Sequence, residues 1–397
     1  MFDTRRLTTC LCLCLCLGAL TCAQAAPHTP ASDDVVLERL QVRPADPRMA
    51  EVNALKKALR DKPGDVDTAV ALAHRYFDLV AAEGDPRYVG YAQAALGAWW
   101  AMPEPPQRVR VMRAILVQFS HKFPAALADL DAAVRADPND LEAWSWLAAI
   151  HMVQADYDEV RRDCAAVAPA TSALLATACV AYVDSMTGHA AAAAGAIRNA
   201  LRASPQASAA ERLWVLTRLA EIEERLGHDA AAEGAFRQAL ALDVSDSYLQ
   251  AAYADFLLDR GRAAEVVKML KDQTRNDVLL LRLAIAAKAT NDPGAAGWAA
   301  DMAARFDAAR LRGDATHQKE EARFALLVQE QPARSLVLAK ENYAVQREAI
   351  DARILLEAAI AAHDPAAARP VLDWMARSHV ESVALSRLAA AAKGAAS

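Results

Sequence analysis

The chain has 397 residues, of which 54% are hydrophobic but only 6% aromatic, and its formal net charge at pH 7 is −6. A net negative charge argues against nucleic acid or anionic lipid as the main partner. With few aromatic residues and 14 glycines, the apolar content is largely Ala, Leu and Val, which fill closely packed helices. Few segments have the pattern of strands, so we predict an all-α fold.

Residues 1–25 have the three parts of a secretory signal peptide. Arg5 and Arg6 form a positive n-region, residues 7–22 an apolar h-region, and residues 23–25 an A-x-A cleavage site. We therefore expect the mature chain to begin near Ala26. This signal is bacterial in character, so we expect a periplasmic or secreted protein.

A lipoprotein is the alternative, with Cys22 as the acylated first residue. Leu20 and Thr21, which precede it, are larger than the residues usually found before such a cysteine. No later apolar run reaches the roughly 18 residues that a membrane span needs. We therefore predict no transmembrane segment after cleavage.

Two cysteines, Cys164 and Cys179, remain once the signal peptide is removed. The other five of the seven leave with it: Cys10, Cys12, Cys14, Cys16 and Cys22. Two cysteines in an oxidising compartment predict one disulfide bond. The alternative is a pair of buried, unbonded cysteines that act as small hydrophobes.

Residues 26–64 are rich in proline and charge, and we interpret them as a tail followed by a lead-in helix at about 48–60. Helical periodicity begins at Val66. The stripe that follows consists of Ala69, Leu72, Tyr76 and Leu79. Gly84 breaks this helix, and Asp85-Pro86 is a strong start signal for the next one.

A two-helix pattern recurs along the chain from this point. Its clearest copy lies in Leu216–Leu242, where the marked positions are Leu219, Ala220, Gly227, Ala232, Phe236 and Ala239. The same order returns at a period of about thirty-four residues, which is the signature of a stacked helical array. We place a regular array at 65–275. In 276–397 helix pairs continue, but their spacing drifts.

These positions resemble the tetratricopeptide repeat (TPR) family over roughly Val66 to Met375, most strongly from Val109 to Asp272. The resemblance implies a right-handed α-solenoid with a concave groove that binds peptides or helices of other proteins. It also implies no catalytic activity, because most members have none.

The inner helix of each pair lines the groove in this family. Carried over to this sequence, the groove positions are Gln118, Phe119, Ala149, Met152, Tyr182, Met186, Glu221, Glu224, Asp255 and Asp259. The aromatic and methionine side chains would grip apolar side chains of a partner. The four acids would select basic ones. The alternative is that these acids only keep an empty surface soluble.

No catalytic or cofactor motif of useful specificity occurs, and we predict no catalytic residue, cofactor or metal site. The best metal candidate is His317 with Glu320 and Glu321, one helical turn apart. The favoured interpretation is that Thr316 caps a helix whose first turn carries acids to suit the helix dipole.

The sequence therefore predicts an exported, non-enzymatic scaffold or adaptor that binds a basic, partly apolar polypeptide. The alternative is a small-ligand protein or an enzyme with a pocket in 310–348, where Asn342, Gln346, Arg347 and Glu348 form a polar patch. An open groove with exposed Met152, Tyr182 and Met186 would favour the scaffold. Polar side chains that meet in a closed cavity would favour the alternative.

Overall fold

The structure is a computed structural model that describes residues 47–313 and 316–394. The predicted signal peptide and nearly all of the predicted tail lie outside these residues. The chain separates into two units, residues 1–50 and 51–397, and the boundary falls within helix α2 (Pro47–Asp61). Only the first turn of α2 belongs to the described part of the first unit. Everything below concerns the second unit.

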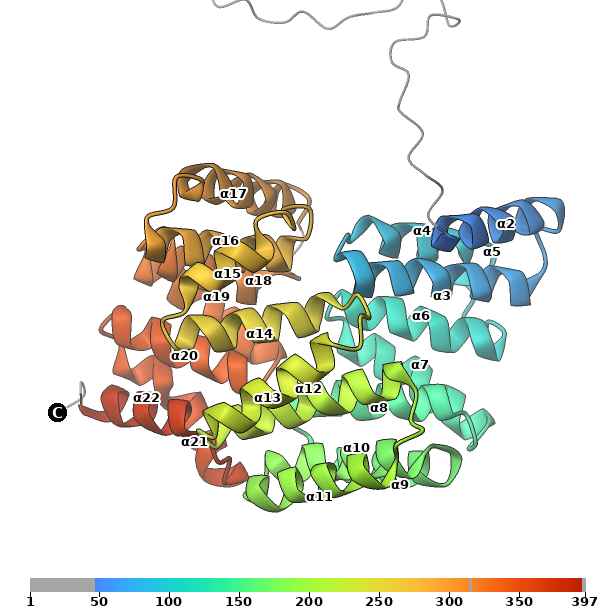
Figure 1. Ribbon diagram of the computed structural model, residues 1–397. Helices are drawn as coiled ribbons and strands as arrows, with labels where there is room; N and C mark the ends of the chain where they lie inside the picture. Colours follow the sequence, from blue (N-terminus) through green and yellow to red (C-terminus); the bar gives the residue numbers. More distant parts are fainter. Residues whose placement is uncertain (1–46, 314–315, 395–397) are drawn as a thin grey trace, which may run out of the picture. The chain divides into compact units, whose positions relative to one another are not determined.

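All regular elements among the described residues are helices, 21 α-helices and two short 3₁₀ helices (Figure 1). After α2 they are α3 (Val66–Glu83), α4 (Arg87–Ala95), α5 (Gly97–Trp100), α6 (Gln107–Phe119), α7 (Phe123–Ala136), α8 (Leu141–Gln154), α9 (Tyr157–Val167), η1 (Ala168–Ala170), α10 (Ala173–Ser185), α11 (Ala190–Ala203), α12 (Ala209–Arg225), α13 (Asp229–Leu240), α14 (Ser247–Asp259), α15 (Ala263–Leu270), α16 (Asp277–Thr290), α17 (Ala295–Leu311), α18 (Gln318–Leu327), α19 (Pro332–Val345), α20 (Ala349–Ala361), η2 (Pro365–Ala368), α21 (Arg369–Ser378) and α22 (Val383–Gly394). The all-α prediction is confirmed. No helix in the described ranges combines the length and hydropathy that a bilayer-spanning helix requires.

The first pair shows why the helices begin and end where they do. The carboxylate of Asp65 accepts hydrogen bonds from the backbone N–H groups of Asp67 and Thr68 and so caps α3. Gly84 ends α3 with a φ of 66°, a conformation that glycine adopts without steric cost. The second helix begins one residue later than expected, at Arg87.

Consecutive helices pack as pairs, and each pair shares its core with the next. This holds for α3/α4, α6/α7, α8/α9, α10/α11, α12/α13, α16/α17 and α18/α19. One apolar cluster runs without interruption from Leu174 to Phe324. At its centre Phe236 is fully buried, with its ring centroid 5.6 Å from that of Tyr253 and 5.5 Å from that of Phe256. The array is therefore a TPR-like solenoid in which neighbouring helix pairs share apolar clusters.

The last helices pack back onto the middle of the array. A second apolar cluster joins residues of α8, α9 and α10 to residues of α18–α22. The backbone N–H of Arg347 donates to the carbonyl of Val153 at 2.7 Å, and Trp374 Nε1 donates to the Tyr157 hydroxyl at 3.2 Å. The solenoid thus curves tightly enough for repeats about 200 residues apart to touch, as the separation of 217 between Tyr157 and Trp374 shows.

The buried phenylalanine of α13 provides a test of the shared core. Phe236→Ala should destabilise the protein by about 3–5 kcal/mol, because it removes a fully buried ring and leaves a cavity. Val337 is 56% exposed, so the control Val337→Ala should change stability by about 0.5 kcal/mol or less. Urea unfolding followed by circular dichroism measures both. Equal midpoints for the two variants would contradict this core.

Candidate binding surface

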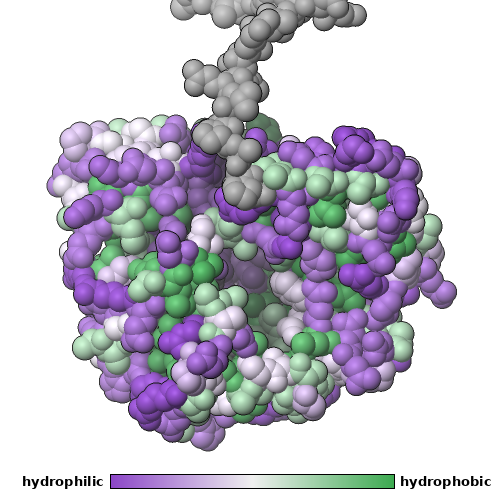
Figure 2. Space-filling model, turned by 45° about the vertical axis from the view of Figure 1, so that its right-hand side comes forward, coloured by the Kyte–Doolittle hydropathy of each residue, from purple (hydrophilic) through white to green (hydrophobic). Residues whose placement is uncertain are grey.

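Seven of the eight predicted partner-binding residues face one central hollow of about 370 Å³. They are Met152, Tyr182, Met186, Glu221, Glu224, Asp255 and Asp259. Phe119 is not among the residues that line it; its ring packs edge-on against Phe77, with centroids 6.3 Å apart. The wall of the hollow also includes residues of α16, α18, α20 and α22. Figure 2 shows one hollowed face of the molecule, where hydrophobic and hydrophilic residues alternate.

Two of the predicted apolar anchors are buried, contrary to the expectation that an open groove exposes them. Met152 is 7% exposed and Met186 4% exposed. Both belong to the same apolar cluster as Leu355 of α20 and Leu385 of α22. The C-terminal helices therefore cover these methionines, and neither side chain is free to grip a partner in this state.

Asp255 is held by two arginines of the same chain. Its carboxylate accepts from Arg282 at 2.7 Å and from two nitrogens of Arg323 at 2.9 Å each. Burial alone would raise the pKa of this carboxyl, but the two guanidinium groups outweigh burial and hold the pKa well below its ordinary value. Asp255 stays ionised and has its charge compensated from within.

The other acids of the predicted groove are also paired. Asp259 accepts from Arg353 of α20. Glu221 accepts from the Tyr248 hydroxyl at 2.6 Å and lies 3.1 Å from Arg218. The lining that the sequence marks as acidic is thus neutralised by arginine side chains and is not available to select a basic partner. Two of these arginines, Arg323 and Arg353, lie 68 and 94 residues from the acids that they bind.

Glu224 is less fully compensated than Asp255. It accepts from Arg260 at 3.1 Å. Burial, together with the nearby charge of Asp259, raises the pKa of the Glu224 carboxyl to about 7, and Arg260 offsets only part of this effect.

Of the predicted polar patch in 310–348, only Glu348 lines the hollow, together with Lys319 and Glu320 from the same stretch. Lys319 Nζ lies 3.6 Å from an oxygen of Asp351 and 3.9 Å from an oxygen of Glu348. Burial would lower the pKa of Lys319, but the carboxylates, with Asp351 first among them, raise it above its ordinary value. Asn342 Nδ2 donates to Asp351 at 2.9 Å and fixes this carboxylate. Charged side chains therefore do meet here, as the small-ligand alternative requires.

The metal candidate is not assembled. Glu320 lines the hollow, whereas Glu321 is bound by Arg310 and Arg334. His317 is the N-cap residue of α18, and it lines a different cavity. Within the described ranges, the three side chains do not form a ligand set for a metal ion.

An apolar trough of about 490 Å³ remains open beside the hollow. Its wall consists mainly of Leu141, Trp146, Ala149, Met152 and Val153 of α8, Leu175 and Tyr182 of α10, and Trp214 of α12. Trp214 is 38% exposed. Arg218 closes one end: its guanidinium stacks between the rings of Tyr182 and Tyr248, 5.0 and 4.7 Å from their centroids. Tyr182 and Glu348 line both the trough and the hollow, so the two spaces adjoin.

Three predicted groove positions, Ala149, Met152 and Tyr182, line this trough. Trp146 and Trp214 also line it and were not predicted. A signal for Trp146 was present, because Trp146, Ala149 and Val153 are spaced three and four residues apart and so share one helix face. Trp214 stands one turn before Arg218 on α12 in the same way.

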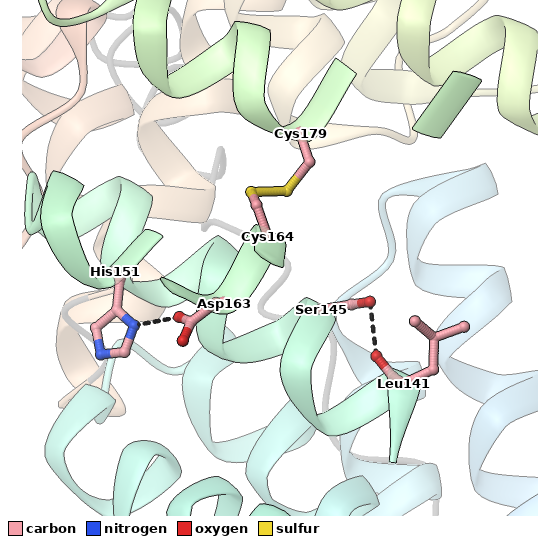
Figure 3. The surroundings of a disulfide bond; sticks show 6 residues. All are labelled: Leu141, Ser145, His151, Asp163, Cys164 and Cys179. Atoms are coloured by element: carbon pink, nitrogen blue, oxygen red, sulfur yellow. Dashed lines mark hydrogen bonds and ion pairs between the residues drawn. A yellow bond between two sulfur atoms is a disulfide. The ribbon is translucent and has the colours of Figure 1, made fainter. Parts of the chain in front are cut away.

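Cys164 of α9 and Cys179 of α10 form a disulfide bond, with their Cα atoms 5.8 Å apart (Figure 3). Cys179 lines the trough, as do Val160 and Val167 of α9, so the bond joins two helices that contribute to the wall of the trough. Nearby, His151 Nδ1 lies 2.7 Å from the fully buried carboxylate of Asp163 (Figure 3). Both contacts join neighbouring helices beneath the trough.

The disulfide gives a prediction about redox-dependent stability. A bond that closes a separation of 15 residues contributes roughly 3 kcal/mol on the chain-entropy model. The double variant Cys164→Ala/Cys179→Ala should be destabilised by about that much without reductant. With reductant, it should differ much less from the wild type. Alkylation of the denatured, unreduced protein provides the direct check: two free thiols would refute the bond.

Glu224 gives a prediction about pH. Because its folded pKa lies above its unfolded value, the folded state binds the extra proton, and the associated stability is lost as pH rises through about 7. Glu224→Gln should therefore flatten the decline of the urea midpoint between pH 5 and pH 7.5. The control Glu265→Gln, at an exposed glutamate whose pKa Arg262 lowers, should keep that decline. An unchanged slope in Glu224→Gln would show that Glu224 does not cause it.

Comparison with known proteins gives only distant structural similarity. No family model and no curated protein matches the sequence. A crystal structure of the APC/C hetero-tetramer Cut9-Hcn1 matches with 14% identity and a TM-score of 0.40, over 78% of this chain but only 52% of that one. A tetratricopeptide repeat protein from Parabacteroides merdae ATCC 43184 matches with 13% identity and a TM-score of 0.32, over 79% and 99%. The P58(IPK) TPR domain matches with 11% identity and a TM-score of 0.22, over 88% and 94%. We therefore assign the TPR-like fold from the helix pairs themselves.

Proposed function

We propose that this protein is a non-catalytic interaction protein that binds a short apolar segment of a partner polypeptide in the apolar trough. The observation that carries this proposal is the pair of tryptophans, Trp146 and the partly exposed Trp214, in the wall of one open, largely apolar space. Tryptophans at the centre of such spaces contribute most to binding in protein interfaces. The TPR-like arrangement supports the proposal, because inner helices α8, α10 and α12 form this wall.

The size and charge of the trough define the partner segment. A space of about 490 Å³ holds a few side chains rather than a whole helix. The acids that were expected to select basic residues are paired with arginines, so they exert little long-range attraction. We infer that the partner segment presents apolar or aromatic side chains and needs no excess of basic ones.

Tyr182 and Glu348 give the inner end of the trough its polarity. The Tyr182 hydroxyl accepts a hydrogen bond from Arg218 at 3.0 Å, and burial raises the pKa of Tyr182 to about 12. Glu348 caps α20 and stands at the junction with the hollow. A backbone N–H of the bound segment would find acceptors here, which would fix the direction of the segment.

We also propose that the protein acts outside the cytoplasm. Two features support this: the signal-peptide pattern of residues 1–25 and the Cys164–Cys179 disulfide, since such bonds persist in oxidising compartments.

A second candidate function is the binding of a small polar molecule in the hollow. The specific observation in its favour is the meeting of Lys319, Glu320 and Glu348 in a space of about 370 Å³. Its ligand would have to exchange contacts with charges that already compensate one another, which makes this candidate weaker than the trough.

A peptide selection tests the main proposal. A displayed library of random peptides should yield binders rich in aromatic and aliphatic residues, and their affinity should fall by about 1–3 kcal/mol in Trp214→Ala. Ala149→Glu should also block them, because it places a charged side chain in the trough wall. Trp144 lies on α8, as Ala149 does, but it does not line the trough. Trp144→Ala is therefore the control for the loss of a tryptophan.

The outcomes separate the candidates. Equal affinity of the selected peptides for Trp214→Ala and Trp144→Ala would contradict binding in the trough. Peptide binding that Lys319→Met abolishes, while Trp214→Ala leaves it intact, would assign binding to the hollow instead.

A further inference from the structure

A third space, which we call the C-terminal cleft, lies between the end of α19 and the segment η2–α21. It has a volume of about 750 Å³ and shares no lining residue with the hollow or the trough. Its wall includes Tyr343, Leu355, Pro370 and Trp374. Neither the proposed function nor the fold requires a space at this place.

Positive charge in this cleft is not compensated. The side chains of Lys340, Arg347 and Arg377 are exposed and make no hydrogen bond or ion pair with any residue that the structure describes. The two acids of the cleft do have partners. Asp373 lies 3.8 Å from Arg369, and Asp364 accepts from the backbone N–H of Ala367 at 3.2 Å. Among the described residues, the cleft therefore has three cations without an ion pair and one carboxylate, that of Asp364, without one, which leaves an excess of positive charge.

The arginines around the hollow differ from these cations. Around the hollow the arginines Arg282, Arg323 and Arg353 each pair with a carboxylate of another helix. Arg347, Arg377 and Lys340 converge on one space without such a carboxylate. An oxyanion from solution would supply the missing charge, and guanidinium groups bind oxyanions with charge-assisted hydrogen bonds.

The hydroxyl of Tyr343 is a second feature that favours an oxyanion ligand. Its side chain lines the cleft but is only 5% exposed, and its hydroxyl has no hydrogen-bond partner among the described residues. Burial raises the pKa of Tyr343, so the hydroxyl stays protonated and remains a donor. A buried donor without an acceptor destabilises the protein, and an oxyanion that reaches this wall would remove that cost.

The remaining wall is apolar. Leu355, Pro370 and the indole of Trp374 line it, and Trp374 is fixed by its hydrogen bond to the Tyr157 hydroxyl. A cation cluster beside a fixed indole suits a ligand with a charged head and an apolar body.

We propose that the C-terminal cleft binds a small molecule that carries a phosphate or carboxylate group on an apolar, preferably aromatic, body. Arg347, Arg377 and Lys340 bind the head group, with the Tyr343 hydroxyl as a further donor. Trp374, Leu355 and Pro370 contact the body. The site is separate from the trough, so it can be tested without any knowledge of the partner polypeptide.

Isothermal titration calorimetry at low ionic strength provides the test, with phenyl phosphate and benzoate as probes. At least one should bind with a stoichiometry of one, more tightly than inorganic phosphate or acetate, and phenol should not bind. The probe that binds more tightly shows whether the cleft prefers a phosphate or a carboxylate group. Arg347→Ala and Arg377→Ala should each weaken binding roughly tenfold, the effect of one charge-assisted hydrogen bond.

Three further variants make the result specific. Arg347→Lys should restore part of the affinity, because it keeps the charge but loses the planar fork. Tyr343→Phe should weaken binding without lowering the melting temperature of the free protein, because its hydroxyl has no partner to lose. Lys271 is an exposed cation outside the cleft, so Lys271→Ala should leave affinity unchanged.

Either of two results would overturn the proposal. One is the absence of saturable binding by both aromatic probes. The other is binding that Arg347→Ala and Arg377→Ala weaken no more than Lys271→Ala does, which would mark a nonspecific attraction of anions.

Discussion

The carboxylate of Asp255 is the contact on which the arrangement of the inner helices depends. It lies on α14 and is bound by Arg282 of α16 and by both terminal nitrogens of Arg323 of α18. Asp255 is only partly exposed, and the two arginines satisfy the charge and lone pairs of its carboxylate, so these ion pairs hold the three helices together. The ion pair between Asp259 and Arg353 of α20 extends the same constraint by one more repeat.

This constraint explains why the inner face is no open groove. Once α14 is joined to α18 and α20, the C-terminal repeats lie over the inner helices, and Met152 and Met186 become part of a core. Besides the hollow, the accessible spaces include the apolar trough of α8, α10 and α12 and the C-terminal cleft. The arginines of the hollow are paired with carboxylates of this chain, so they hold helices together. The arginines that we assign to binding in the cleft have no such carboxylate.

The helices and their pairing could be predicted from the sequence because they follow from local patterns. Ala232, Phe236 and Ala239, which the repeat pattern predicts as contact positions, are all fully buried. Gly227, expected at the turn, has a φ of 78°. Spacing of small and large residues fixes which face of a helix is buried, and turn residues fix where it ends.

The curvature of the array could not be predicted in this way, and the candidate site depends on it. The partners of Asp255 and Asp259 lie up to 68 and 94 residues away in the sequence, and no periodic pattern connects them. Family positions correctly indicated that Met152, Tyr182 and Glu221 face inward. They did not indicate whether that inward face is exposed to solvent or covered by other helices. Small rotations between successive repeats determine this, because they set the curvature of the array.

A double-mutant cycle between Asp255 and Arg323 tests the central claim most directly. The free energies of unfolding of the wild type, Asp255→Asn, Arg323→Gln and the double variant give the coupling between the two side chains. Residues in direct contact within one ion-pair network should be coupled by about 1–3 kcal/mol, with the double variant less destabilised than the sum of the single ones. Effects that add within about 0.5 kcal/mol would show that α14 and α18 are not joined here, and the inner face would then be open.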